Sequence, residues 1–123
     1  MNKLGQNGMA YDKGLAERLD DYFRNRPDVE VKRMFGGLCY MVGNRMCCGI
    51  VGEALMARVG PGNYGECLKL PHVREMDFTG RPLGGFVYVE PEGFSSDEAL
   101  AEWVGRCEAF VRSLPPKIPK HLL

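Results

Sequence analysis

The sequence predicts an α+β domain of two layers: an antiparallel β-sheet meander covered by an N-terminal and a C-terminal helix, plus a short middle helix. Apolar residues recur at helical spacing near both ends of the 123-residue chain. Between them, glycine-containing pairs separate short apolar segments, which is the pattern of β-hairpins. With 45% apolar and 26% charged residues, the composition is that of a globular domain. We expect a single domain over residues 9–117, with flexible tails at 1–8 and 118–123.

The N-terminal helix is predicted from Asp12 onward. Four apolar residues follow the i, i+4, i+7, i+8 spacing of one helix face, namely Leu15, Leu19, Tyr22 and Phe23. Charged side chains occupy the other faces, so we expect this helix on the surface of the domain. Pro27 disfavours helical backbone angles at the residue before it, and the helix is therefore expected to end near Asn25.

The first part of the sheet is predicted as four strands, at residues 29–35, 38–42, 45–51 and 54–59. Gly43-Asn44 and Gly52-Glu53 are typical of two-residue hairpin loops, which fix strand pairing by counting outward from the loop. This count gives the opposed pairs Val42 with Arg45, Met41 with Met46, Tyr40 with Cys47, Cys39 with Cys48, Ile50 with Leu55, Cys48 with Ala57 and Cys47 with Arg58.

Because side chains alternate along a strand, this register sorts them onto two faces. The predicted core face is apolar and holds Cys39, Met41, Met46, Cys48, Ile50, Leu55, Ala57 and Val59. The other face mixes apolar and cationic groups, and we predict a binding surface there made of Arg33, Tyr40, Arg45, Cys47, Met56 and Arg58. Cations beside an aromatic ring can hold an anion, an acidic partner or a stacked base. Alternatively, the arginine stems cover apolar sheet surface, or a second subunit buries the face.

Gly36 and Gly37 are predicted to form a turn or bulge, since glycine adopts positive φ angles without strain. A two-residue turn at this pair would place Arg33 beside Tyr40 and Lys32 on the apolar face, where an unpaired ammonium is unfavourable. We therefore keep two alternatives. Either Lys32 lies near the sheet edge, or the glycine pair is a bulge that resets the register.

The second half of the chain is predicted to contain two more strands and two helices. Asn63 can cap a short helix that Pro71 ends, and strands are expected at 73–78 and 86–90 with a loop at 80–85 between them. Ser95 and Glu98 match a capping box at the start of the last helix. Its apolar stripe runs until Pro115-Pro116 and comprises Leu100, Trp103, Val104, Cys107, Phe110, Val111 and Leu114.

Five cysteines are an odd number, and a chain of this size does not need disulfides to fold, so we expect reduced thiols. Cys39 opposite Cys48 is a candidate redox pair, although two small thiols filling the core explain the pair more simply. The cysteines lack the spacing of a zinc knuckle, and no metal site is predicted. A thiol-dependent enzyme using Cys47 or Cys67 remains an alternative, with His72 and Asp77 as a base pair that nothing in the sequence orients.

Sixteen basic and sixteen acidic residues give a formal charge of zero, which favours neither a nucleic-acid backbone nor an anionic membrane. Nucleic-acid binding would have to rest on a local set of Arg33, Arg45 and Arg58, and we do not favour it. The chain shows no secretion signal and no apolar run of membrane-spanning length, so we expect a cytoplasmic protein.

Three ordered motifs resemble the TfoX N-terminal domain family: Lys32-Arg33-Met34-Phe35-Gly36-Gly37-Leu38, Met46-Cys47-Cys48-Gly49, and Met76-Asp77-Phe78-Thr79-Gly80-Arg81-Pro82 followed by Gly85-Phe86-Val87-Tyr88-Val89. The resemblance runs from about residue 9 to residue 117. It implies a two-layer α+β domain with an antiparallel sheet, and it brings no catalytic residues. Family members include regulators of natural competence that carry a second, C-terminal helical domain, which these residues do not contain; we expect a stand-alone domain.

From these observations we expect a non-catalytic regulatory or protein-interaction module. It is predicted to form a homodimer and to bind an unknown protein partner through the mixed face, without a cofactor. The alternatives are a small thiol-dependent or ligand-binding enzyme, and a nucleic-acid-binding domain that uses the arginine-bearing face.

Overall fold

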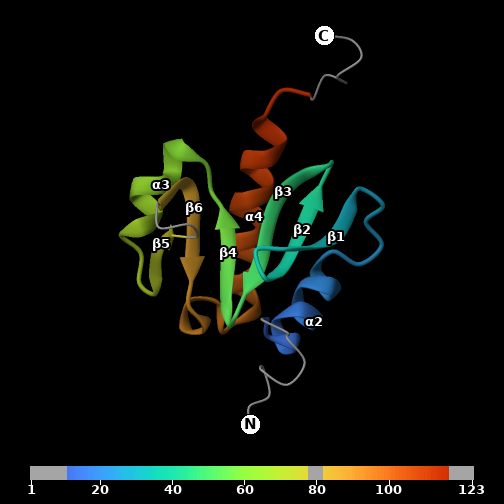
Figure 1. Cartoon of the computed structure of the whole chain (residues 1–123), viewed down its shortest axis with the longest axis horizontal. Helices are drawn as coiled ribbons and strands as arrows, with labels where there is room; N and C mark the ends of the chain where they lie inside the picture. The colour runs from blue at the N-terminus through green and yellow to red at the C-terminus, as the bar shows by residue number, and fades with distance from the viewer. Residues whose placement is uncertain (1–10, 78–81, 117–123) are drawn as a thin grey trace.

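The computed structural model describes residues 11–77 and 82–116 (Figure 1); the predicted tails at 1–8 and 118–123 lie outside them. The helices are α2 (Lys13–Tyr22), α3 (Pro61–Leu68) and α4 (Asp97–Ser113), with the short 3-10 helix η1 (Pro91–Phe94). The strands are β1 (Val29–Met34), β2 (Gly37–Val42), β3 (Arg45–Val51), β4 (Ala54–Arg58), β5 (Val73–Asp77) and β6 (Pro82–Val89). The predicted α+β class is confirmed.

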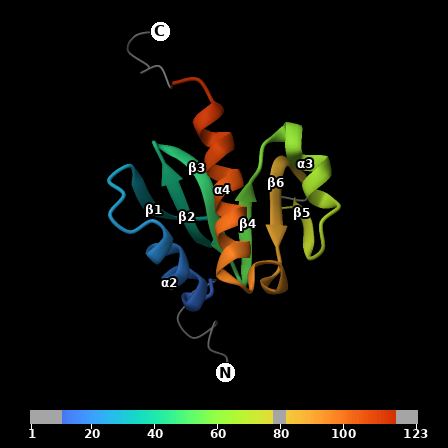
Figure 2. The same ribbon diagram turned by 180° about the vertical axis from the view of Figure 1, so that it is seen from behind.

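The six strands form one antiparallel sheet in the order β1-β2-β3-β4-β6-β5. The first four are a meander, as predicted, and β5 lies outside β6 at the far edge. Helices α2, α3 and α4 all pack on the same side of the sheet, where their buried residues join one core cluster. In Figure 1 the strands lie in front of α4, and in Figure 2 α4 lies in front of the strands. We call the side away from these helices the open face.

The N-terminal helix forms as its sequence predicts. The Asp12 side chain caps α2 by accepting a hydrogen bond from the Leu15 backbone N–H at 3.3 Å. Leu15 and Leu19, on the side of α2 that faces the sheet, are fully buried. The helix ends at Tyr22, and Asn25 then adopts φ 62°, a left-handed angle that asparagine tolerates better than most residues.

The first turn of the meander confirms one of the two alternatives that the sequence left open: Lys32 lies at the sheet edge, because β1 is an end strand, whereas the glycine pair is not a bulge. Phe35 and Gly36 are the turn residues, with φ 58° and 75°, and Met34 pairs with Gly37 across the turn. Arg33 therefore lies opposite Leu38, and Tyr40 opposite Val31. The predicted pairing of Arg33 with Tyr40 is wrong, because the turn sits one residue earlier than the glycine pair suggests.

A β-bulge changes the second hairpin. Its turn, at Gly43 and Asn44, and the pair Met41–Met46 are as predicted, but Tyr40 pairs with Cys48 and leaves Cys47 as the extra residue. The predicted pairs of Tyr40 with Cys47 and of Cys39 with Cys48 are therefore wrong, and Cys39 lies opposite Gly49. The third hairpin has the predicted register from Ile50 opposite Leu55 to Cys48 opposite Ala57, but the ladder ends there, so the predicted pair of Cys47 with Arg58 is wrong.

The bulge also corrects the predicted faces, because one extra residue resets the alternation of side chains. Leu38, Tyr40 and Val42 lie on the helix-covered side, whereas Cys39, Met41 and Met46 lie on the open face. The other predicted core residues pack under the helices, namely Cys48, Ile50, Leu55, Ala57 and Val59.

Three boundaries in the second half of the chain differ from prediction. Helix α3 begins at Pro61 rather than near Asn63, since proline suits the first helical position. Strand β6 begins at Pro82, which pairs with Asp77 at a strand start, where proline is tolerated; residues 78–81 of the predicted loop lie outside the described residues. Ser96 caps α4 by accepting from the Ala99 N–H at 3.0 Å, so the predicted box starting at Ser95 is wrong by one residue.

A cluster of polar groups ties the start of the sheet to α4. The carboxylate of Glu108 accepts from Arg26 at 2.7 Å, from Arg112 at 3.1 Å and from the Tyr22 hydroxyl at 3.2 Å. Arg26 also pairs with Asp28 at 3.0 Å. These bonds join α2, the loop before β1 and the last turns of α4, and they fix where β1 enters the sheet.

Candidate functional site

The open face is lined by apolar side chains although none of the described helices covers it. Five of its residues are fully or almost fully buried, namely Cys39, Ala54, Met56, Met76 and Tyr88. Seven more are half-buried around them, namely Met34, Phe35, Met41, Met46, Val51, Leu83 and Phe86. Five of the chain's seven methionines thus lie on this one face.

Gly49 leaves room for the side chains of neighbouring strands to pack closely on the open face. A Cβ atom at Gly49, in the middle of β3, would lie 2.3 Å from the Leu38 carbonyl oxygen and 3.0 Å from the Met56 methyl carbon. The absence of a side chain therefore lets β2 approach closely and lets Met56 fill the space over β3. Together with the bulge at Cys47, which increases local twist, this explains how Cys39 and Met56 are buried without a covering helix.

One row of paired residues crosses the open face from edge to edge: Lys32, Cys39, Gly49, Met56, Tyr88 and Arg74. Its centre is apolar and its ends are cationic. The guanidinium of Arg74 lies 4.5 Å from the centre of the Tyr88 ring and is paired with Glu90. The open face is therefore a strip of thioethers and rings with charged groups at both margins.

Methionine gives this strip an adaptable surface. Its unbranched side chain has three rotatable bonds and a polarizable sulfur, so a methionine surface can fit apolar groups of different shape. The Cys39 Sγ and Met41 Sδ atoms lie 3.7 Å apart, which shows how tightly the sulfur groups pack. Met34, Met41 and Met46 remain half-exposed and are available for contact.

The structure does not bring the predicted binding residues together. Tyr40 is 1% exposed and lies beneath α2, where its hydroxyl donates to the Asp20 carboxylate at 2.8 Å and its ring stacks on Phe23. Arg33 is exposed at the end of β1, beside the first turn. Arg45 lies at the opposite end of the hairpin, on the helix-covered side, and donates to the Pro115 carbonyl.

Of the predicted residues, Met56 belongs to the open face, whereas Arg58 lies at the end of β4, between Phe86 of that face and Phe110 of α4. The Arg58 guanidinium lies between two rings, 5.5 Å from the Phe86 centroid and 5.3 Å from the Phe110 centroid. It also donates to the Met46 carbonyl at 3.2 Å, beside the bulge, where the β3–β4 ladder stops. Arg58 thus compensates the interrupted ladder, which is a structural role. Met56 is fully buried at the centre of the face.

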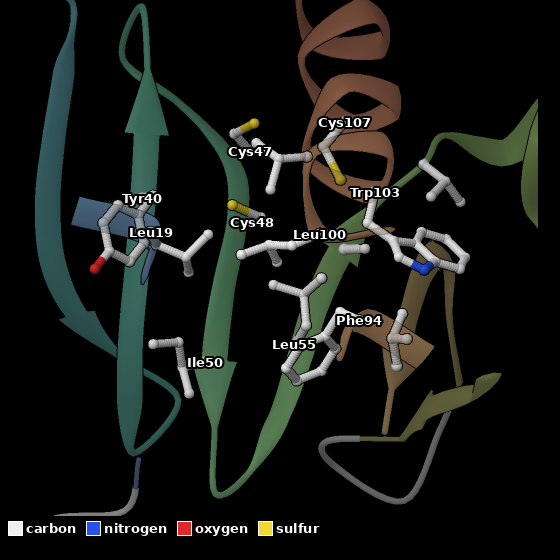
Figure 3. Close-up of a cluster of buried hydrophobic side chains, with 14 of the residues drawn as sticks. Leu19, Tyr40, Cys47, Cys48, Ile50, Leu55, Phe94, Leu100, Trp103 and Cys107 are labelled. Carbon is white, nitrogen blue, oxygen red and sulfur yellow. The ribbon is translucent and has the colours of Figure 1, made fainter. Parts of the chain in front are cut away.

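The thiols are all buried, and they lie on two sides of the sheet. Cys39 is on the open face, whereas Cys48 is under the helices, so the structure separates this candidate pair. The bulge instead turns Cys47 and Cys48 to the same side, toward Cys107 of α4 (Figure 3). In the part of the chain that the structure describes, no three His, Cys, Asp or Glu side chains are grouped so as to hold a metal ion.

Burial makes these thiols poor nucleophiles. It raises the pKa of Cys39 to about 11, and it also raises the pKa of Cys67. Burial raises the pKa of Cys107 well above its ordinary value, and for Cys48 a hydrogen bond with Cys47 and burial act in the same direction. Because the thiolate is the reactive form, these side chains lack the lowered pKa of a catalytic cysteine.

We expect the folded state to lose stability in alkaline solution. The thiol pKa is about 8.5 in an unfolded chain, whereas Cys39 titrates at about 11 in the fold. Protons therefore leave the unfolded chain first, so the contribution of Cys39 to stability is fully present below about pH 8.5 and is lost as the pH rises toward 11. Urea unfolding followed from neutral pH to about pH 10.5 measures this slope. A Cys39→Ala variant should show a shallower slope, and a urea midpoint independent of pH would contradict the prediction.

Sequence reasoning found Met56 but missed the other methionines of the open face. Met41 and Met46 were paired correctly but were assigned to the core side, since nothing at Cys47-Cys48 signals a bulge. The usable signal was the abundance of methionine itself, combined with the alternation of Met34, Met41, Met46 and Met56 along their strands.

A family model for the TfoX N-terminal domain matches residues 21–111. This match spans β1 to β6 and most of α4, so it includes the whole open face. No curated protein and no solved structure gave a match. Among the described residues, no helix is both long and apolar enough to cross a membrane.

Proposed function

Because the chain belongs to the TfoX N-terminal domain family, a family that suggests a competence-regulator-like domain, we propose that it is a non-catalytic regulatory module that acts by binding a protein. The observation that carries this proposal is the open face: a strip of methionines and aromatic rings that the described helices leave uncovered. Exposed apolar surface is unfavourable in water, and a partner that covers the strip removes this cost.

The burial of the thiols argues against the thiol-dependent alternative. The thiol-dependent alternative needs Cys47 or Cys67 as a nucleophile, but both thiols are buried. His72 is exposed in the turn after α3, with φ 66°. We therefore expect all five native thiols to react with a thiol reagent more slowly than free cysteine at neutral pH.

The chemistry of the face indicates the kind of partner. Its half-buried residues offer thioethers, rings, a valine and a leucine, with few groups that donate or accept hydrogen bonds. Such a surface fits an apolar stripe of a partner, as when an amphipathic helix is laid into an apolar groove. The ammonium group of Lys32 at one margin favours an acidic residue beside that stripe, whereas Arg74 at the other margin is already paired with Glu90.

The experiment is a comparison of two matched variants. Met41→Lys/Met46→Lys places charge on the open face, whereas Leu70→Lys changes an exposed apolar residue beyond α3, on the helix-covered side. A partner is first identified by photo-crosslinking through methionine analogues and is then purified. We expect the double variant to weaken its binding by about a hundredfold, since several apolar contacts are lost, and Leu70→Lys to leave binding unchanged. Equal binding by all three proteins would contradict the use of the open face.

A further inference from the structure

Strand β1 is an edge strand that carries an exposed valine between charged residues of both signs. It stands at the end of the strand order and pairs only with β2. Its four central residues, 30–33, are all exposed. Val31 is 45% exposed, more than any other large apolar side chain among the described residues. Edge strands offer unpaired N–H and C=O groups to any strand that can add to them.

The pairing with β2 shows which backbone groups of β1 point outward. Met34 and Gly37 flank a two-residue turn and are therefore a hydrogen-bonded pair, so Met34, Lys32 and Glu30 direct their backbone groups toward β2. The Asp28 carbonyl accepts from the Gly43 N–H at 2.9 Å, which fits the same alternation. The N–H and C=O groups of Val31 and Arg33 consequently point away from the sheet.

We propose that two copies of this chain pair through β1, antiparallel and about a two-fold axis that passes between their Val31 residues. Each Val31 then exchanges N–H and C=O bonds with its symmetry mate. The Arg33 N–H donates to the other copy's Val29 carbonyl, which is free to accept because the turn before β1 uses the Val29 N–H and not its C=O. The two exposed Val31 side chains meet on the helix-covered side.

The charges of Glu30 and Lys32 favour this register over the neighbouring ones. With Val31 opposite itself, Glu30 of each copy faces Lys32 of the other on the open face, so both cross-strand pairs join opposite charges. A shift of the axis to Lys32 would oppose two lysines, and a shift to Glu30 would oppose two glutamates. A shift to Val29 would oppose Glu30 and Asp28, which also repel. The Val31-centred pairing is therefore the register in which the edge complements itself.

The other edge of the sheet is less suited to such pairing. Strand β5 has five residues, and its ladder with β6 shifts register between Glu75 and Asp77. Arg74 is already held by Glu90 and by the Tyr88 ring. Short length and an irregular ladder are features that protect an edge strand from addition.

The resulting dimer has one continuous sheet with the helices of both copies on one side and both open faces on the other. This geometry follows because a two-fold axis perpendicular to a sheet keeps each face on its own side. The inference is independent of the proposed function: the dimer can form whether or not the open face binds a protein.

Charge reversal tests the register. Glu30→Lys alone leaves four positive groups at the interface, and Lys32→Glu alone leaves four negative ones, so each variant should dimerise about tenfold or more weakly than the wild type. An equimolar mixture of the two variants restores opposite pairs and should form a heterodimer. Sedimentation over a range of concentrations measures all three cases. Glu102→Lys, an exposed site on α4, gives the same change of net charge away from the edge and should dimerise like the wild type.

Amide hydrogen exchange on the wild-type protein provides a second measurement, which does not depend on whether a variant folds. The N–H groups of Val31 and Arg33 should exchange more slowly at high than at low protein concentration, while that of Lys32, which bonds within the sheet, should not change. A wild-type protein that stays monomeric at high micromolar concentration would overturn the proposal. So would a dimer that survives both single reversals, or one that leaves the Val31 amide unprotected.

Discussion

Replacing Gly37 with alanine is expected to destabilise the fold by about 3 kcal/mol or more, although Gly37 is not at a positive φ angle. A Cβ atom there would lie 1.9 Å from the Ile50 carbonyl oxygen and 3.3 Å from the Val51 Cα atom. Both neighbours are backbone atoms of the adjacent strand β3, which cannot rotate aside as a side chain would. The central strands must therefore separate locally to admit the methyl group.

Gly36 is the matched control because it is the adjacent glycine, and it has a positive φ angle but open space where a side chain would lie. Its φ is 75°, but nothing lies within 4 Å of the position that a Cβ atom would take. Gly36→Ala should therefore cost only about 1–2 kcal/mol, the strain of a left-handed angle at a non-glycine residue. Urea unfolding followed by Trp103 fluorescence measures both variants. Equal effects, or a larger effect at Gly36, would contradict the close approach of β2 and β3 at Gly37.

Replacing Trp103 with alanine is expected to cost about 3–5 kcal/mol, because it opens a cavity between α4 and the sheet. The ring is 5% exposed, and its indole N–H donates to the Gly93 carbonyl at 3.2 Å, which holds η1 against α4. Figure 3 shows it in the same cluster as Phe94 and Leu55. The guanidinium of Arg106 lies 4.6 Å from the ring centroid and loses that contact as well.

Trp103→Phe separates the contribution of apolar packing from that of the hydrogen bond to Gly93. It keeps most of the apolar volume and removes the hydrogen bond to Gly93, so we expect a loss of about 1–2 kcal/mol. Thermal unfolding followed by circular dichroism suits this pair, since Trp103 is the only tryptophan and its fluorescence disappears with it. If Trp103→Ala cost no more than Trp103→Phe, the packing of α4 on the sheet would differ from the one described here.

The elements governed by local sequence could be predicted. The apolar spacing around Leu15 and Leu19, the turn at Gly43-Asn44 and the stop at Pro115 each act through neighbouring residues, and each is where the sequence indicates. Family resemblance added the antiparallel sheet as a whole. The cap of α4 was missed by one residue because Ser95 and Ser96 compete for the same position.

The candidate site could not be predicted, because it depends on one bulge. Cys47-Cys48 carries no glycine or proline, so counting from the loop continues past it without interruption. The bulge is favoured by tertiary contacts: it turns Tyr40 under α2, where Phe23 and Asp20 contact it, and it leaves a carbonyl for Arg58. None of these contacts is local in sequence. The residues of the predicted arginine-bearing surface therefore do not lie together, and the candidate site is the methionine-lined open face instead.

Both the binding proposal and the dimer depend on which side of the sheet each β2 residue occupies. The most direct measurement is a set of nuclear Overhauser effects from the rings and methyl groups of β2. We expect strong contacts between the Tyr40 and Phe23 rings, whose centroids lie 5.6 Å apart, and between the opposed side chains of Met41 and Met46 on the open face. Contacts of Tyr40 with Arg58, together with contacts of Met41 with α2, would contradict the account.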